Sequence, residues 1–224
     1  MPPSRPAPES RPFDSRSGAF QEGRSTSDSA SAGSHWVLSN IHGRSNVSAR
    51  RLASPGPSDA QLAELLRLAA AAPDHGRTTP WRFVLIPAAQ RQPLAQAFAQ
   101  ALLERSPGAA QAQLEAAQEK AYRAPCLLVA IACRGGASAA MPQAEGLISM
   151  GAAIQNMLLG ARVMGYGSSL ASGQSMNAEA LRRLFRLGEH ESAICFVNLG
   201  TVTSLKAGLA LRPDIDKFFS VLTA

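Results

Sequence analysis

The segment from Glu145 to Met164 restricts the possible folds of this chain more than any other part. It has the length of a long helix, and its apolar residues go nearly all round that helix: Leu147, Ile148, Ile154, Met157, Leu158, Leu159 and Val163. A helix that is apolar on every side has to be buried on every side. In a domain of this size, we therefore expect a central helix that packs against a sheet on one face and a partner subunit on the other.

Shorter helical and strand patterns around this segment predict a layered α+β domain. The run Cys126 to Cys133 is short and apolar at nearly every position, which is typical of a central strand covered on both faces. We expect Ser58 and Asn177 to cap two of the helices. Further strands are predicted at residues 81–86, 168–171 and 193–199, further helices at 36–43, 59–72, 90–105, 109–122 and 178–184, and loops at 44–57 and 74–80.

Residues 1–34 are predicted to be a disordered tail, because they are rich in Ser, Pro, Gly and Arg and lack apolar periodicity. Residues 35–224 have the size of one domain. The sequence has neither an uninterrupted apolar run of about 18 residues nor a signal-like apolar N-terminal segment. The cysteines, Cys126, Cys133 and Cys195, are odd in number and form no CxxC pair, which favours buried thiols in a reducing compartment. We therefore expect a cytoplasmic protein that does not span a membrane.

The net charge of +6 belongs to the folded part, since basic and acidic residues balance within the tail. A basic protein can bind nucleic acid, acidic lipid, or an anionic cofactor or substrate. The arginines of the folded part are scattered and aromatic residues make up only 5 % of the chain. A basic stripe with stacking aromatics is therefore absent, and we expect no nucleic-acid partner.

The segment Arg44-Ser45-Asn46-Val47-Ser48 has the composition of a phosphate site. Arginine offers a forked, charged donor, and hydroxyl or amide groups can complete the hydrogen bonds to phosphate oxygens. The same composition is also common in solvated loops, so both interpretations remain open for this segment alone.

The polar loop from Asp74 to Pro80 lies between a predicted helix end and a predicted strand. In such a loop, His75 is able to donate a hydrogen bond to a ring carbonyl or a phosphate, while Asp74 either fixes the His75 tautomer or caps the turn. The sequence has no G-x-S-x-G nucleophile motif, no P-loop, no G-x-G-x-x-G fingerprint and no metal-like Cys/His spacing. Hydrolase, Rossmann and metal-site interpretations are therefore disfavoured.

Taken in order, five segments resemble the FMN-dependent nitroreductases, and within them the YdjA-like subgroup. The resemblance covers roughly residues 36 to 220. Its segments are Asn46-Val47-Ser48 with Arg50-Arg51-Leu52, Ala72-Pro73-Asp74-His75-Gly76 with Pro80-Trp81-Arg82-Phe83, Ser149-x-Gly151-Ala152-Ala153-x-Gln155-Asn156, Gly165-Tyr166-Gly167, and Gly188-Glu189-His190-Glu191 leading to Leu199-Gly200-Thr201.

The resemblance implies a nitroreductase-like α+β sandwich, with a central antiparallel sheet flanked by helices, in an intertwined homodimer. It implies FMN in a cleft between subunits, with NAD(P)H as co-substrate and a small molecule such as a nitroaromatic or quinone as electron acceptor. It implies that the flavin carries the chemistry without a catalytic side chain. Its implied cofactor contacts are Arg44, Ser45 and Asn46 at the phosphate, Ala71 and His75 near the flavin, Leu170, Ala171, Ser172 and Gly173 beside the ring, and Arg212 from the C-terminal segment.

The chain departs from the family pattern at two of these positions. The subgroup has arginine where this chain has Ala71, and Trp-x-x-Gly is common where this chain has Leu170 to Gly173. Losing one charge-assisted hydrogen bond costs about 1.5–3 kcal/mol. Two alternatives to an active reductase therefore stay open: a binding or scaffold protein on the same fold, and a flavoenzyme with a different reaction.

Overall fold

The computed structural model describes residues 28–133, 143–204 and 212–222. The chain divides into one unit of residues 35–206 and a second unit made of the terminal segments 1–34 and 207–224. The sheet and the helices that cover it belong to the first unit. Residues 135–140, whose sequence predicts a flexible connection, lie outside the described residues.

Within the described residues, five strands form one sheet in which every pairing is antiparallel. The strand order is β1-β5-β3-β2, and β4 also pairs with β5. This confirms the predicted antiparallel sheet and the central place of Cys126–Cys133. The strands are β1 (Leu52–Ala53), β2 (Trp81–Leu85), β3 (Cys126–Cys133), β4 (Gly167–Ala171) and β5 (Glu191–Val202).

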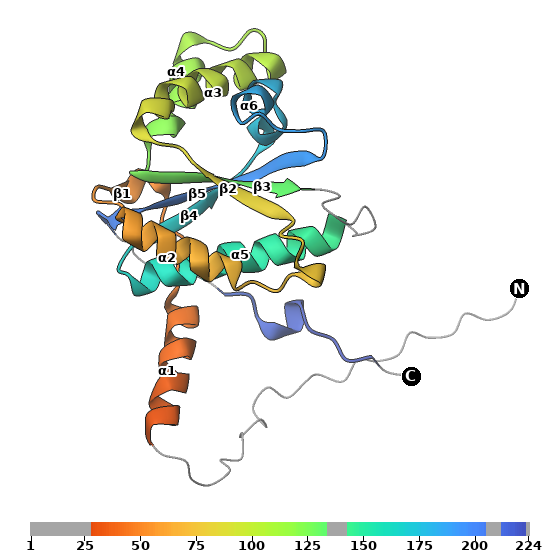
Figure 1. The fold of residues 1–224 in the computed structure, drawn as a ribbon. Coiled ribbons are helices and arrows are strands. Elements are labelled where there is room, and N and C mark those ends of the chain that lie inside the picture. The colour runs from red at the N-terminus through yellow and green to blue at the C-terminus, as the bar shows by residue number, and fades with distance from the viewer. Residues whose placement is uncertain (1–27, 134–142, 205–211, 223–224) are drawn as a thin grey trace, which may run out of the picture. The chain divides into compact units, whose positions relative to one another are not determined.

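Helices cover both faces of the sheet (Figure 1). α2 (Asp59–Ala70) and α5 (Gln143–Val163) lie on one face. α3 (Arg91–Arg105), α4 (Gln111–Glu119) and α6 (Glu179–Leu184) lie on the other. Residues along β3 alternate between the two cores: Leu128 and Ala130 pack with α2 and α5, whereas Val129 packs with the opposite helices. This double burial is the reason that β3 has no polar position.

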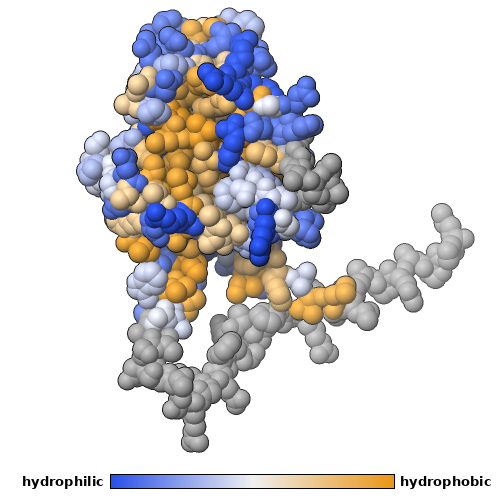
Figure 2. All heavy atoms as spheres, viewed as in Figure 1, coloured by the Kyte–Doolittle hydropathy of each residue, from blue (hydrophilic) through white to orange (hydrophobic). Residues whose placement is uncertain are grey.

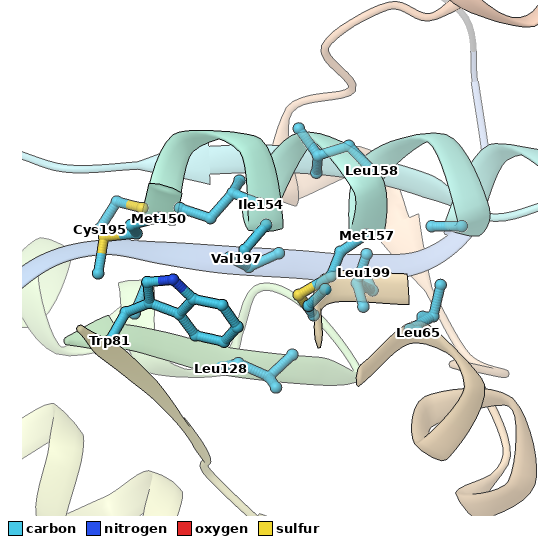
Figure 3. Close-up of a cluster of buried hydrophobic side chains, with 14 of the residues drawn as sticks. Leu65, Trp81, Leu128, Met150, Ile154, Met157, Leu158, Cys195, Val197 and Leu199 are labelled. Carbon is cyan, nitrogen blue, oxygen red and sulfur yellow. The ribbon is translucent and has the colours of Figure 1, made fainter. Parts of the chain in front are cut away.

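The core between α5 and the sheet is built from large side chains that meet across the layer. In Figure 3, Ile154 and Met157 project from α5 toward Val197 and Leu199 of β5. Trp81 at the start of β2 lies in the same core, and its indole Nε1 donates a hydrogen bond of 3.0 Å to the buried Ser149 Oγ. Burial of the tryptophan therefore leaves its polar atom satisfied.

The two predicted helix caps had different outcomes. Ser58 caps α2 in a capping box: Ser58 Oγ accepts from the Gln61 amide, and Gln61 Oε1 accepts from the Ser58 amide. The prediction for Asn177 was wrong, because α6 begins at Glu179 with Ala178 at its N-cap. The carboxylate of Glu104, from α3, instead accepts from the Glu179 and Ala180 amides, each at 3.0 Å.

Two boundaries near the N-terminus also differ from prediction. The first helix, α1 (Asp28–Gly43), begins before Trp36, so the disorder predicted for the tail does not hold for residues 28–34. These residues are small and polar, and the search for apolar spacing could not find their helix. Residues 1–27 lie outside the described part of the chain. The predicted loop 44–57 contains the 3₁₀ turn Ala49–Arg51 and β1, which is too short to show a strand pattern.

An ion pair joins the two outer strands of the β2-β3-β5 region. Arg82 on β2 donates two hydrogen bonds to the Glu191 carboxylate on β5, at 2.6 and 2.9 Å. These bonds hold the pKa of Glu191 at about 2 despite partial burial. The Cys133 thiol also donates to Glu191, at 3.7 Å. The three strands are therefore tied together at this end of the sheet.

All three cysteines are free thiols. Cys126 and Cys195 are buried as predicted, and burial raises the pKa of each to about 11. Cys133 is half-buried, and burial raises its pKa as well. Among the described helices, none combines the length and apolarity needed to cross a membrane.

Candidate functional site

Two cavities border β4 and the loop that follows α1. The amide of Val47 donates to the Ser168 carbonyl at 2.9 Å, which holds this loop against β4. One cavity, the Arg44 cavity, lies at the Gly167 end of β4 and has a volume of about 400 Å³. The other, the Ser172 cavity, lies at the Ala171 end and has a volume of about 360 Å³. Both volumes fall within the usual range for small-molecule sites.

The Arg44 cavity contains part of the predicted phosphate site. Its lining includes two arginines, Arg44 and Arg162 of α5, together with Ser45, Trp36 and Tyr166. Tyr166 also donates its hydroxyl proton to Gln61 Oε1 at 2.9 Å. Asn46 is exposed and does not line either cavity. This end of β4 therefore offers cationic and hydroxyl donors to an anion.

The Ser172 cavity joins the predicted ring contacts to a group of basic side chains. Ala171, Ser172 and Gly173 form one wall, and Ala49 extends the cavity toward the loop after α1. Its apolar lining is Phe98, Leu127, Met176 and Phe196, of which the Phe98 and Phe196 rings meet edge to face at 5.4 Å. The remaining polar lining includes Arg105, Lys120, Arg123, Gln174, Ser175 and Asn198.

No aspartate or glutamate is among the described residues that line the Ser172 cavity. Arg123 is partly neutralised, since it donates to Glu119 at 3.2 and 3.5 Å, and these bonds lower the pKa of that carboxyl. Arg105 and Lys120 have no ion-pair or side-chain hydrogen-bond partner within the described part of the chain. The cavity consequently favours an apolar ligand that carries negative charge.

Arg105, Lys120 and Arg123 form the basic wall of the Ser172 cavity, and a buried arginine helps to position it. Arg91 on α3 donates to the carbonyl oxygens of Ala121, at 2.8 Å, and Pro125, at 3.1 Å. Burial lowers the pKa of Arg91. Because both carbonyls lie in the segment that carries Lys120 and Arg123, Arg91 fixes this segment against α3. Asn198 lines the same cavity from β5. It is only 4 % exposed, and its side-chain amide donates to the Ser169 carbonyl at 3.3 Å.

Sequence reasoning missed the basic wall of this cavity. Arg105 ends α3, and Lys120 and Arg123 follow α4, so only the packing of the two helices brings the three together. The position of Arg105 and Lys120 at the ends of helices was only a weak indication of a binding site, because cations are common at helix C-termini for electrostatic reasons alone. Asn198 was also missed, because a single polar residue inside an apolar strand does not identify its ligand.

The backbone at Gly173 has a conformation that glycine alone adopts readily. Its φ of 147° and ψ of −173° place it in a region that a Cβ atom makes unfavourable. Gly173 follows Ser172 at the point where the chain leaves β4 and turns into the 3₁₀ segment Gln174–Asn177. The shape of this cavity wall therefore depends on glycine at this position.

The His75 loop, residues 74–80, lines neither of these two cavities. Asp74 caps the turn, because its carboxylate accepts from the Thr79 amide at 2.6 Å and from the Thr78 hydroxyl at 3.2 Å. His75 Nδ1 lies 3.7 Å from Glu145 Oε2, and the histidine side chain is 82 % exposed. Arg77 and Thr79 have positive φ angles, of 55° and 45°, which strains the loop. Such strain is frequent at functional sites.

Within one copy of the chain, the predicted site residues do not meet in one place. Arg44 and Ser45 line one cavity, and Ala171 and Ser172 line the other. Leu170 is exposed on β4, and neither Ala71 nor His75 lines either cavity. Arg212 belongs to the other unit of the chain.

Comparison with known proteins decides the family. The sequence profile of the Nitroreductase family matches residues 44–201. This chain belongs to the nitroreductase family. An Escherichia coli K12 relative named "Putative NAD(P)H nitroreductase YdjA" is 30 % identical over 172 residues, which cover 76 % of this chain and 92 % of the relative. A Haemophilus influenzae relative named "Putative NAD(P)H nitroreductase" is also 30 % identical, over 68 % of this chain and 82 % of its own length.

Solved structures confirm the nitroreductase fold. A nitroreductase-like family protein from Bacillus cereus has a TM-score of 0.71 at 19 % identity, covering 84 % of this chain and 96 % of that structure. The FMN-dependent nitroreductase NfnB from Mycobacterium smegmatis, solved in complex with NADPH, has a TM-score of 0.64 at 17 % identity, covering 85 % and 99 %. The predicted family and α+β sandwich are therefore both confirmed.

Proposed function

We propose that this nitroreductase-family protein is an FMN-dependent NAD(P)H oxidoreductase whose flavin ring lies in the Ser172 cavity. The observation that carries the proposal is this cavity itself, with its apolar lining, basic wall and absence of described acidic residues. It includes Ala171 and Ser172, at the positions where the family resemblance predicts the ring. The relatives named as NAD(P)H nitroreductases and the FMN-dependent NfnB support the same cofactor and co-substrate.

The lining residues fit FMN chemically. Phe98, Phe196 and Met176 offer apolar contacts to the tricyclic ring, and Asn198, Ser172 and Gln174 offer hydrogen-bonding groups to its polar edge. Bound FMN would accept a hydride from NAD(P)H and pass the electron pair to an acceptor such as a quinone or nitroaromatic. Arg123 supplies positive charge that favours a reduced, anionic ring. We retain Arg44, Ser45 and Asn46 as the residues proposed to bind the phosphate.

The proposed reaction needs no side-chain nucleophile. The residues of the cavity bind and orient the ring, and they exclude water where Phe98 and Phe196 cover it. We place the enzyme in the cytoplasm, since free thiols are typical of a reducing compartment. We propose a small molecule as the physiological acceptor, as the family resemblance implies.

The first test is the cofactor. The purified protein should show two flavin absorbance bands between 300 and 550 nm, release FMN on heating, and oxidise NAD(P)H when a quinone or nitroaromatic is supplied. Arg44→Gln should weaken FMN binding roughly tenfold to a hundredfold, the loss expected for one charge-assisted hydrogen bond. Arg67→Gln removes the same charge from the exposed side of α2 and should leave FMN affinity unchanged.

A wild-type protein that is colourless and does not bind added FMN would contradict this function and favour the scaffold alternative. Normal FMN affinity in Arg44→Gln would contradict only the phosphate assignment. Flavin binding without NAD(P)H consumption across several acceptors would exclude a reductase while retaining the cofactor site.

We further propose that two copies of the chain form a homodimer through α5 and α1. α5 is apolar all round, and the structure leaves Leu147, Val163 and Ile148 exposed, the last by 72 %. Apolar residues are also exposed along α1, where Figure 2 shows them as orange spheres. A second copy supplies apolar contacts for this surface, and the family resemblance implies an intertwined homodimer.

Ile148→Glu should shift the protein from dimer to monomer, because it places a charge in the proposed interface. Light scattering coupled to gel filtration, at fixed protein concentration, measures the change in mass. Ala112→Glu adds the same charge to exposed α4 on the opposite face of the sheet and should remain dimeric. A monomeric wild-type protein, or a dimer unchanged by Ile148→Glu, would exclude this interface.

A further inference from the structure

A smaller cavity adjoins the Ser172 cavity between α3 and α4. It has a volume of about 190 Å³, and Phe98, Arg105, Lys120 and Ser175 line both cavities. The additional lining of the smaller cavity is Leu102, Gln113, Ala116 and Ala117. The two cavities therefore adjoin each other, and Arg105 and Lys120 lie between them.

We propose that the side cavity binds the anionic group of the substrate that reacts with the flavin, through Arg105 and Lys120. This inference rests on the proposed function. At about 190 Å³, the side cavity is smaller than a usual complete ligand site, so it accommodates one part of a larger molecule. The group is a phosphate or a carboxylate, since both accept hydrogen bonds from guanidinium and ammonium groups.

The charges around the side cavity support an anionic ligand. Its described lining contains two cations and no carboxylate. The nearest acidic residue in sequence, Glu104, accepts hydrogen bonds from the Glu179 and Ala180 amides at the start of α6. Glu119, next to Lys120, is engaged by Arg123 and lies 3.8 Å from Arg50. Neighbouring carboxylates are thus committed to other partners, which leaves the positive charge of Arg105 and Lys120 available.

The apolar lining strengthens the electrostatic attraction of Arg105 and Lys120 for an anion. Phe98, Leu102 and Ala117 form a low-dielectric wall beside Arg105 and Lys120. Walls of this kind concentrate the field of a cationic cleft and strengthen its attraction for an anion. The same wall gives contact surface to a ring or to the carbon skeleton that carries the anionic group. The proposed substrate therefore combines an apolar body with one negative group.

Two substrates of a flavin reductase carry such a group. One is NADPH, whose 2′-phosphate distinguishes it from NADH. The other is an acidic acceptor, such as a nitroaromatic carboxylate. Matched pairs separate them: NADPH against NADH, and 4-nitrobenzoate against 4-nitrobenzamide. In each pair the two members share the reacting group and differ in the negative charge.

The experiment compares FMN-loaded wild-type protein with Arg105→Gln and Lys120→Gln. We expect kcat/KM for the anionic member of one pair to fall roughly tenfold to a hundredfold, while its neutral or less charged counterpart changes by less than about twofold. Calorimetry with adenosine 2′,5′-bisphosphate and with 4-nitrobenzoate measures the same loss without turnover. Arg67→Gln, which removes an exposed charge from α2, should match the wild type.

The pair that responds identifies the source of the anion, and a response in either pair supports the proposal. Equal losses for both members of each pair, no loss for any, or a tenfold weaker FMN affinity in the variants would overturn it. The last result would assign Arg105 and Lys120 to the flavin itself. If wild-type protein does not bind FMN, the proposed function fails, and calorimetry with the two anions still decides whether the side cavity binds them.

Discussion

Leu128→Ala should lower the free energy of unfolding by about 3 kcal/mol, within the range of roughly 2–5 kcal/mol for a buried leucine. Leu128 lies on the central strand β3, is only 1 % exposed, and pairs in register with Val197 on one side and Leu85 on the other. In Figure 3 it lies in the core beneath α5. The tight packing around it prevents the cavity left by alanine from collapsing.

Leu85→Ala is the matched control for this substitution. Leu85 is the register partner of Leu128 on β2, and it is 44 % exposed. The same chemical change should therefore cost about 1 kcal/mol or less at Leu85, because water already solvates part of the side chain. Urea denaturation at fixed protein concentration measures both values. Equal losses for the two variants would mean that Leu128 is not buried between β3 and α5 in solution.

The contrast between these two leucines also shows which parts of the fold the sequence predicts well. A strand buried on both faces produces a continuous apolar run, and such a run at Cys126 to Cys133 predicted β3 with its correct bounds. The length and the nearly all-round apolarity of Glu145 to Met164 were equally informative, and they predicted α5 to within two residues at each end. Both signals come from many residues that share one environment.

The errors arose where a feature depends on few residues or on a distant partner. β1 consists of two residues and exists because Leu52 and Ala53 pair with β5. α6 has no side-chain cap of its own, since Glu104, far away in the sequence, accepts the hydrogen bonds of its first amides. A pattern search along the chain does not detect contacts of this type.

The same distinction between local sequence and distant contacts holds for the residues of the candidate site. The family resemblance implied Ala171 and Ser172 as contacts of the flavin ring, and both residues line a cavity. Arg105 and Lys120 were not predicted, because they become neighbours only when α3 packs on α4. The wall that Ala171 and Ser172 form ends at Gly173, and the effect of the Gly173 backbone conformation can be tested directly.

Gly173→Ala should weaken FMN binding roughly tenfold to a hundredfold. The φ of 147° at Gly173 is unfavourable for any residue with a Cβ atom, and such strain costs on the order of 1–3 kcal/mol. There is no steric obstacle, since a Cβ at this position has no atom within 4 Å among the described residues. The strain is relieved only if the backbone of Ser172 to Gln174 moves, which displaces the wall of the Ser172 cavity.

Gly108→Ala separates this strain from the effect of an added methyl group. A Cβ at Gly108 also has no described atom within 4 Å, but Gly108 does not have a positive φ and lies in the turn between α3 and α4. It should therefore bind FMN within about twofold of the wild type, while Gly173→Ala does not. Titration of FMN fluorescence measures both affinities, and urea denaturation shows whether each variant is folded. If folded Gly173→Ala binds FMN as well as Gly108→Ala does, FMN binding does not depend on the conformation of this wall, which would contradict the placement of the ring against Ser172 and Gly173.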